Sequence, residues 1–575
     1  MGLGSFVLML HSHLPFYRKA GMWPFGEENL YECMAETYLP LLNLFYELKE
    51  SGIQAGVTVG ITPILAEQLN DPHLQQGFVD YLLVRLNSVQ KDIERFDTET
   101  VANANQLGRL ARYYRDWFAQ LLSDYEHKYH RNLLAAFRQL QDDGCIEITT
   151  SAATHGFLPL LGNDASIEAQ LKTGVETYKY HFGREPQGVW LPECAYRPAK
   201  EMTNPETGET QVRPCIDAFL HKYGLKYFFT EYHAIEGAES ASNRRVFGIY
   251  DWDVQYLPML RSQPSTGLST HEAYWLKEYP VAVMARNNRA SFQVWSASYG
   301  YPGDGLYREF HRRDDQSGMH YWRLTSKDCD LGQKLLYDPQ SAHDKAKEHA
   351  SHFVSLVNDL AKEQYGKTGE QALIMVSFDT ELFGHWWFEG IEWLKAVITG
   401  LHSQNDIAVE TAGQYVANHS PRTAIQLPES TWGQGGHYWV WNNHNTDWMW
   451  PLIHEAETRM KQLANQYAAE SDGLKVRVLN QMARELLLLE SSDWPFLVTT
   501  FQAKDYAVER FQTHVDHFWA LARMLEATVD EAQLAQIEEK DNPFQFIDYR
   551  WYNAAPIPQP THVVAPHTLV ATPSG

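Results

Sequence analysis

The sequence is poor in cysteine and has no long apolar runs. Its 575 residues include only five cysteines, an odd number without CxxC spacing, which favours a reducing compartment over a disulfide framework. No segment approaches the roughly 18 uninterrupted apolar residues of a membrane-spanning helix. The apolar run at the N-terminus lacks a positive flank and is interrupted at His11, unlike a secretory signal. We therefore expect a soluble cytoplasmic protein with no membrane partner.

Basic residues are also scarce. The chain carries 48 Lys and Arg against 72 Asp and Glu, for a net charge of −24, whereas nucleic acids and anionic membranes are bound by basic surfaces. Aromatic residues are abundant, with 18 Trp and 31 Tyr, and flat aromatic faces are surfaces on which sugars stack. The composition argues against nucleic acid and favours a neutral or cationic ligand.

Short apolar runs alternate with amphipathic stretches over the first 400 or so residues. The runs predict buried strands at 5–10, 55–61, 146–149, 187–191, 225–230, 281–284 and 373–378. In the intervening stretch 107–121, apolar residues recur at spacings of three and four, as in a helix. Strands that are apolar on both faces and alternate with helices indicate an α/β fold with a parallel sheet, which about seven strands can close into a barrel.

The pattern divides the chain into four parts. We assign 1–195 and 250–420 to the barrel, and the polar, turn-rich region 196–249 to an insertion subdomain. From 421 to 550 strand-like runs disappear, and periodic patterns predict helices at 450–469, 474–490 and 501–526. The proline-punctuated, almost uncharged stretch 551–575 is predicted to be a disordered tail.

Polar side chains follow several of the predicted strands at the point where each strand ends. They are His11 and His13 after the first, His155 after the third, Glu193 after the fourth, Glu231 and His233 after the fifth, and Asp379, Glu381 and His385 after the last. Parallel barrels place their chemistry at the C-terminal ends of their strands. Convergence on one rim is not expected from independent structural roles, so the sequence predicts an active site there.

Taken singly, each of these side chains also has a structural interpretation. A histidine after a strand is often a hydrogen-bonded structural residue. Glu193 could pair with Arg197 or Arg286, and Asp379 could cap the following helix. Taken together, two carboxylates suit cleavage of a glycosidic bond, in which one group protonates the leaving oxygen and the other stabilises the oxocarbenium-like centre. A zinc site formed by His11, His13 and a carboxylate is the alternative.

Seven motifs, in order, resemble glycoside hydrolase family 57, and within it the α-glucan (glycogen) branching enzymes. They are HSHLPF, ATHGFLP, WLPECAYRP, VWSASYGYPGD, FDTELFGHWWFEG, TWGQGGHYWVW and SSDWPF. The resemblance runs from Met1 to about Asn553. It implies an incomplete parallel (β/α)7 barrel with a helical insertion after the fourth strand and a C-terminal α-helical domain. It also implies a retaining mechanism with no metal or other cofactor.

The same resemblance implies roles for individual residues. Glu193 matches the nucleophile of the family and Asp379 its acid/base. The residues that match positions along the bound glucan are His11, His13 and His155 around the donor glucose, the aromatic residues Trp23, Trp295, Trp432 and Trp441, and also His385 and Asp493. No individual role is implied for Asp493. Trp432 and Trp441 flank the turn GQGG, and they either project into a groove or seal the junction between the barrel and the helical domain.

The implied activity is cleavage of an α-1,4 linkage in amylose or glycogen and rejoining through an α-1,6 linkage, by a monomer or weak homo-oligomer. The alternatives are an α-amylase or 4-α-glucanotransferase of the same family, a glucan-binding protein on an inactive scaffold, and a metal-dependent hydrolase or deacetylase. The chain departs from the pattern in one place. The loop IEGAESASNRRVF, after the fifth strand, lacks a tyrosine that some branching members are thought to use to shield the intermediate from water.

Overall fold

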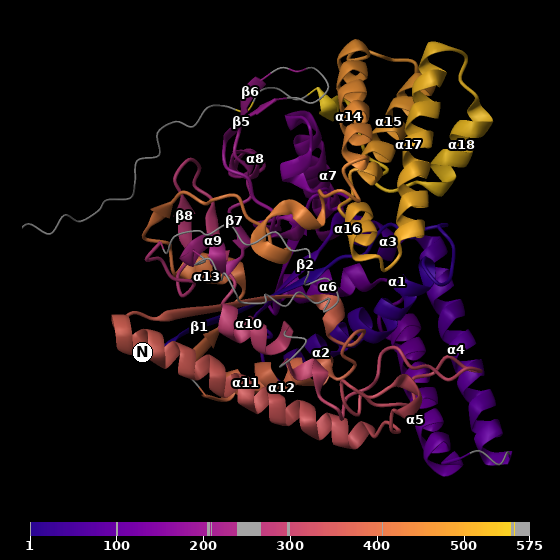
Figure 1. The fold of residues 1–575 in the computed structure, drawn as a ribbon, viewed down its shortest axis with the longest axis vertical. Coiled ribbons are helices and arrows are strands. Elements are labelled where there is room, and N and C mark those ends of the chain that lie inside the picture. The colour runs from indigo at the N-terminus through magenta and orange to yellow at the C-terminus, as the bar shows by residue number, and fades with distance from the viewer. Residues whose placement is uncertain are drawn as a thin grey trace, which may run out of the picture.

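The computed structural model describes residues 2–98, 102–203, 208, 210–237, 266–295, 300–404, 406–553 and 557. A curled sheet lies at the centre of the molecule (Figure 1). Its parallel strands, in spatial order, are β10 (Ala372–Asp379), β1 (Gly4–Ser12), β2 (Val57–Ile61), β3 (Ile146–Ser151), β4 (Gly188–Trp190), β7 (Tyr227–Thr230) and β9 (Ala282–Ala285). All seven predicted strands are confirmed.

Three further strands extend this sheet without closing it. They are β8 (Tyr274–Leu276), antiparallel to β9, then β12 (Ala424–Ile425), parallel to β8, and β11 (Ile407–Val409), parallel to β1. The two ends of the curl meet at β10, where the Asn287 N–H donates to the Met375 carbonyl at 2.7 Å and the Leu373 N–H donates to the His271 carbonyl at 2.9 Å. The predicted incomplete barrel is therefore confirmed.

Both faces of the barrel strands are buried, which explains their continuous apolar sequences. In β1, Phe6 and Leu8 belong to the outer core under the helices, whereas Val7 and Met9 belong to the core inside the barrel. Side chains alternate between the two faces of a strand. His11 has the same parity as Val7 and Met9, so its side chain also points to the inside of the barrel. The alternation therefore places a polar side chain at the barrel mouth.

Helices cover the outside of the sheet. In the barrel region they are α1 (Glu27–Cys33), α2 (Leu39–Glu50), α3 (Pro63–Asn70), α4 (Pro72–Thr98), α5 (Ala104–Ser123), α6 (Leu133–Asp142), α7 (Asp164–Phe182), α8 (Ile216–Lys222), α9 (Tyr232–Glu236), α10 (Asn288–Trp295), α11 (Pro339–Thr368), α12 (Gly390–Gln404) and α13 (Ala412–Asn418). Their ends carry ordinary signals. The Asn163 side chain accepts the Ser166 N–H at the start of α7, and Gly183 ends this helix with φ 70°.

A pair of helices is inserted after the second strand, whereas the resemblance implied a helical insertion after the fourth. Helices α4 and α5 come after β2 and project from the barrel as a pair (Figure 1). After β4, the described residues form the hairpin β5 (Lys200–Thr203) and β6 (Thr210–Arg213), then α8. The range 196–249 also contains β7, a strand of the main sheet. Residues 204–207, 209 and 238–249 lie outside the described part, so the assignment of 196–249 to an insertion subdomain stays a prediction.

The C-terminal part is a cluster of helices standing beside the barrel (Figure 1). It contains α14 (Met449–Gln466), α15 (Gly473–Leu489), α16 (Asp493–Thr500), α17 (Lys504–Glu526) and α18 (Glu531–Lys540). The predicted helix 501–526 begins later, because Phe501 adopts a left-handed φ of 56° and ends α16. Tyr552 is buried against these helices. The ordered chain therefore continues past residue 551, where a tail was predicted, and residues 554–556 and 558–575 lie outside the described part.

None of the helices in the described ranges has both the length and the apolar character needed to cross a bilayer. The loop IEGAESASNRRVF lies outside the described residues beyond Gly237, so its missing tyrosine stays a sequence observation.

Candidate active site

Strand register brings the first and last barrel strands together at the mouth. His11 at the end of β1 pairs with Asp379 at the end of β10. Asp379 has the same parity as Leu373 and Met375, which lie in the core inside the barrel. Both polar side chains therefore point to the inside of the barrel mouth. The residues around this point, His11, His13, His155, Glu193, Asp379, Glu381, Trp432, Ser492 and Asp493, are called the rim site below.

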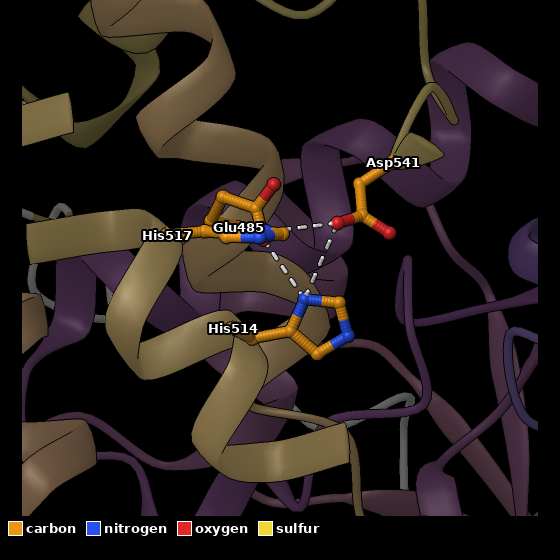
Figure 2. Close-up of side chains that lie close together, drawn as sticks. All are labelled: Glu485, His514, His517 and Asp541. Carbon is orange, nitrogen blue, oxygen red and sulfur yellow. Dashed lines mark hydrogen bonds and ion pairs between the residues drawn. The ribbon is translucent and has the colours of Figure 1, made fainter. Parts of the chain in front are cut away.

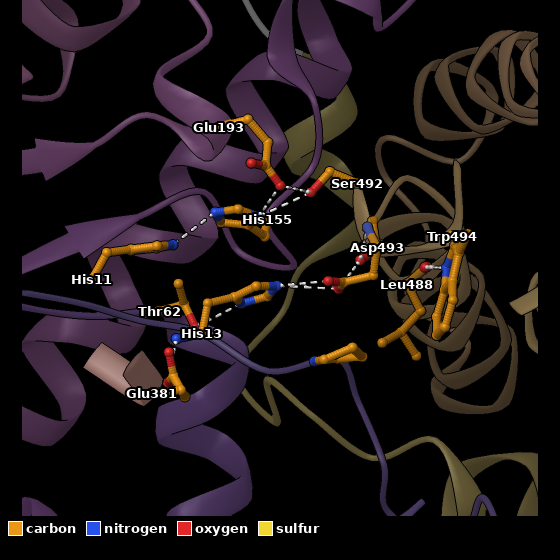
Figure 3. Close-up of polar contacts among 12 residues, drawn as sticks. His11, His13, Thr62, His155, Glu193, Glu381, Leu488, Ser492, Asp493 and Trp494 are labelled. Atoms are coloured by element: carbon orange, nitrogen blue, oxygen red, sulfur yellow. Dashed lines mark hydrogen bonds and ion pairs between the residues drawn. The ribbon is translucent and has the colours of Figure 1, made fainter. Parts of the chain in front are cut away.

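Three histidines stack on one another in the rim site (Figure 3). The ring centroids of His13 and His155 are 3.9 Å apart, and those of His155 and His11 are 5.0 Å apart. His11 stacks in turn on Trp190, at 4.7 Å. Burial lowers the pKa of His11 and of His155 well below the usual value. These two rings are therefore neutral at pH 7 and present hydrogen-bonding nitrogens rather than charge.

Glu193 lies in a strained turn directly after β4. It follows Pro192 in a short 3-10 turn, and its φ is 60°, in the left-handed region. Its Oε2 accepts the indole N–H of Trp432 at 2.6 Å, and its Oε1 lies 3.8 Å from Nδ1 of His155. Arg286 is not its ion-pair partner, because it pairs with Glu231 at 2.7 Å, and the Arg197 side chain donates to the Pro198 carbonyl at 3.3 Å. Non-glycine residues held in this conformation are concentrated at functional sites.

Burial is the main influence on both candidate catalytic carboxyls. Burial raises the pKa of Glu193 to about 8. The Trp432 hydrogen bond acts in the opposite direction, and the charge of Asp379 raises the pKa further. Burial also raises the pKa of Asp379 well above the usual value, and the charge of Glu381 adds to this effect. The neighbouring charge behind the raised Asp379 pKa is therefore that of Glu381, two residues along the same turn.

The sequence motifs contain Glu381 without indicating its contacts. Its carboxylate accepts hydrogen bonds from the Tyr38 hydroxyl and, at 3.2 Å, from the backbone N–H of His13. Burial raises the pKa of Glu381 to about 7. Tyr38 lies more than 300 residues away in sequence, so only the folded chain reveals this link.

The helical domain contributes side chains to the rim site. At the start of α16, the two Asp493 carboxylate oxygens lie 3.0 and 3.1 Å from Nε2 of His13 (Figure 3). The adjacent Ser492 hydroxyl is 2.9 Å from Nδ1 of His155. Thr62 holds the other His13 ring nitrogen at 3.1 Å. Sequence analysis did not identify Ser492 or Thr62, although Ser492 belongs to the SSDWPF motif.

The four tryptophans expected along the glucan path have different environments. Trp23 is 73% exposed, and Trp295 is half-buried with its indole N–H 3.4 Å from the Ser377 carbonyl. Trp432 contacts Glu193 directly. Trp441 is only 1% exposed, and its ring lies 4.6 Å from that of Phe157. The Trp441 ring therefore does not project into a groove, because it fills the core between the barrel and the helical domain.

His385 is held away from the other histidines. Its Nδ1 lies 2.9 Å from a Glu36 carboxylate oxygen, and its ring packs against Phe310. Glu36 also pairs with Arg308 at 2.7 Å. Burial alone would raise the pKa of Glu36, but Arg308 and His385 lower it to about 2. His385 therefore takes part in a buried ion network, and a role in sugar binding stays a prediction.

Among the described residues, the side chains best placed to hold a metal are not at the rim. Glu485, His514, His517 and Asp541 converge in the helical domain (Figure 2). Arg510 lies 3.3 Å from Nε2 of His514 and can only donate a hydrogen bond. The proton of a neutral His514 ring therefore sits on Nδ1, which faces Glu485 at 2.8 Å. This contact pattern is that of hydrogen-bonded ion pairs.

Sequence models of two families match the chain. The model described as "Glycosyl hydrolase family 57" matches residues 7–428, and the one described as "1,4-alpha-glucan branching enzyme, C-terminal" matches residues 452–552. The first covers the barrel with its rim, and the second covers the helices that supply Asp493. The chain therefore belongs to glycosyl hydrolase family 57.

Individual relatives share both the sequence and the fold. A 1,4-alpha-glucan branching enzyme of Thermococcus kodakarensis is 42% identical over 94% of this chain and 77% of its own length. A crystal structure of that enzyme in complex with glucose matches with a TM-score of 0.87 and 41% identity, covering 98% of this chain and 99% of that one. The alpha-amylase AmyC of Thermotoga maritima matches with a TM-score of 0.80 and 30% identity, over 97% of this chain and 100% of that one.

Proposed function

We propose that the protein is a 1,4-α-glucan branching enzyme that cleaves α-1,4 linkages and forms α-1,6 linkages in glycogen-like glucans. The observation that carries the proposal is the pair of half-buried carboxyls, Glu193 and Asp379, in a barrel mouth that the helical domain completes. The match of 452–552 to the branching-enzyme C-terminal model supports branching over other activities of the family. The five unpaired cysteines are consistent with a cytoplasmic location.

The mechanism follows from the two carboxyls. Glu193 acts in its ionised form, which the Trp432 hydrogen bond favours against burial. One of its oxygens forms a bond to the anomeric carbon while the bond to the leaving glucan oxygen breaks. Asp379 gives its proton to that oxygen, as its raised pKa allows. The glucosyl ester then waits on Glu193 until an acceptor 6-hydroxyl attacks the anomeric carbon. Asp379 takes the proton of that hydroxyl, and the ester bond breaks to release Glu193. The anomeric configuration is retained.

The remaining rim residues are proposed to bind the glucan. Neutral His11 and His155, with His13, line the donor glucose, and Asp493 holds His13 in orientation. The exposed ring of Trp23 offers a stacking face for chain segments farther from the cleavage point. We further propose a monomer or weak homo-oligomer as the working state.

Product analysis tests the proposal directly. The protein is incubated with amylose; one portion of the product is examined by proton NMR, and a second portion is digested with a debranching enzyme to release the transferred chains. We expect new α-1,6 linkages with a small rise in reducing ends, and none of either with Glu193→Gln as the matched control. An absence of α-1,6 linkages in the wild-type product would refute branching. A ligand-bound structure with the two carboxyls more than about 9 Å apart would refute retention at this pair.

An α-amylase is the second candidate, because the amylase AmyC shares the fold at 30% identity over almost the whole chain. The same experiment separates the two. Rising reducing ends without new α-1,6 linkages would identify hydrolysis as the main reaction.

A further inference from the structure

The indole of Trp432 points its N–H edge at the proposed nucleophile. Its Nε1 lies 2.6 Å from Oε2 of Glu193. Its ring meets Trp190 nearly edge-on, with the centroids 4.8 Å apart and the planes at 65°. The ring is half-buried, between Glu193 and the core inside the barrel. This orientation suits a hydrogen-bond donor to a carboxylate.

The backbone around Trp432 also fixes the backbone of Glu193. The Glu193 carbonyl accepts the Trp432 N–H at 3.0 Å and the Thr431 hydroxyl at 2.6 Å. Next to this contact, Ser430 and Tyr196 exchange two backbone hydrogen bonds, at 2.8 and 3.1 Å. A non-glycine residue in the left-handed region is strained and persists only where its surroundings determine it. Residues 430–432 therefore hold both the side chain and the strained backbone of Glu193.

The two oxygens of Glu193 are engaged unequally. Oε2 accepts a short N–H bond, of the kind that strengthens when the acceptor is ionised. Among the described residues, Oε1 has a 3.5 Å contact with the Ser492 hydroxyl and lies 3.8 Å from Nδ1 of His155. A bonded oxygen is the poorer nucleophile, because one of its lone pairs is already engaged. A loosely held oxygen reaches an incoming carbon at little cost.

We propose that Trp432 is a positioning residue that holds Oε2 of Glu193 as the spectator oxygen and leaves Oε1 to attack the anomeric carbon. This inference rests on the proposed function. As the Oε1 bond to the anomeric carbon forms, the bond to the leaving glucan oxygen breaks, and that oxygen takes the proton of Asp379. Oε2 becomes the carbonyl oxygen of the ester and still accepts the indole N–H. The donor also favours the ionised form of Glu193 over the protonated form.

Trp432→Phe tests this assignment, because it removes the N–H and keeps an aromatic ring. Turnover is measured from pH 5 to 9 on amylose and, for hydrolysis alone, on a maltooligosaccharide with an activated leaving group. We expect kcat to fall about 10- to 100-fold at neutral pH, the size expected for loss of a hydrogen bond to a charged group. We also expect the acidic limb of the kcat/KM profile to move to higher pH, with KM little changed.

Trp439→Phe is the matched control, since Trp439 lies in the same segment but packs against the helical-domain core; its profile should match the wild type. A Trp432→Phe variant with an unmoved acidic limb and a raised KM for long glucans would show a stacking platform and overturn the inference. So would a uniform loss of activity at every pH. Failure of the branching proposal is recognised separately, from the linkage analysis of the wild-type product. The pH profile of hydrolysis on the activated maltooligosaccharide does not depend on which sugar acceptor the enzyme uses.

Discussion

His517 is predicted to make the stability of the helical domain depend on pH. Its Nδ1 lies 3.1 Å from Asp541 and 3.6 Å from Glu485, on a ring that is 23% exposed (Figure 2). Although burial opposes protonation, these carboxylates raise the pKa of His517 from 6.5 to about 9. At about 1.36 kcal/mol per pKa unit, the full effect is about 3 kcal/mol. Water at the exposed edge of the ring screens these charges and reduces the free energy, so we expect His517 to contribute roughly 1–3 kcal/mol to stability.

The direction of the pH dependence follows from the raised pKa of His517. The folded state holds the proton more tightly than the unfolded state, so the stabilisation is complete below about pH 6.5 and is lost as the pH rises through 9. His517→Gln removes the charge and leaves Arg510 as the nearby cation. The wild type should therefore lose about 1–3 kcal/mol more than the variant in free energy of unfolding between pH 6 and pH 9.5.

Urea unfolding followed by circular dichroism at several pH values measures this difference. His127→Gln, at an exposed position, is the matched control and should follow the wild-type curve. Parallel wild-type and His517→Gln curves across the whole pH range would refute the argument. That result would mean that the contacts in Figure 2 do not bind a proton more tightly in the folded state.

Three further substitutions test the rim site, and a fourth tests the burial of Trp441. Glu193→Gln should abolish transfer, while isothermal titration with a maltooligosaccharide should still show binding. In steady-state kinetics, Asp379→Asn should lose less activity on substrates with a good leaving group than on amylose. Asp493→Asn should lower kcat/KM about 10- to 100-fold, because the charge bonded to His13 is lost; unchanged kinetics would contradict that contact. Trp441→Ala should cost about 3–5 kcal/mol of stability, and a selective loss of long-chain use with an unchanged unfolding midpoint would contradict its burial.

The barrel could be predicted from sequence because its strands are buried on both faces. Their apolar runs stand out against the amphipathic helices, and all seven were placed to within a few residues. The helical pair after the second strand agrees with the sequence pattern, because the periodic stretch 107–121 lies between the predicted strands 55–61 and 146–149. The expected insertion after the fourth strand came from the resemblance to the family and not from periodicity.

The partners of the rim residues could not be read from the sequence either. Burial of Trp441 depends on Phe157, which lies on a distant segment, and the GQGG turn beside it suggested exposure instead. The link between Trp432 and Glu193 joins residues 239 positions apart. Sequence motifs identified these residues as a group, but only tertiary packing determines which of them face the sugar and which support a neighbour.

The register of β1 also bears on how the protein is made. The strand is synthesised first, yet one of its edges pairs with β10, which begins at Ala372. At about 5–20 residues per second, the ribosome needs roughly 20–70 seconds to deliver that partner. Until then, one edge of β1 has no strand beside it, and an open apolar edge is a template for aggregation. The nascent chain therefore needs protection by a chaperone or by its own early helices for most of its synthesis.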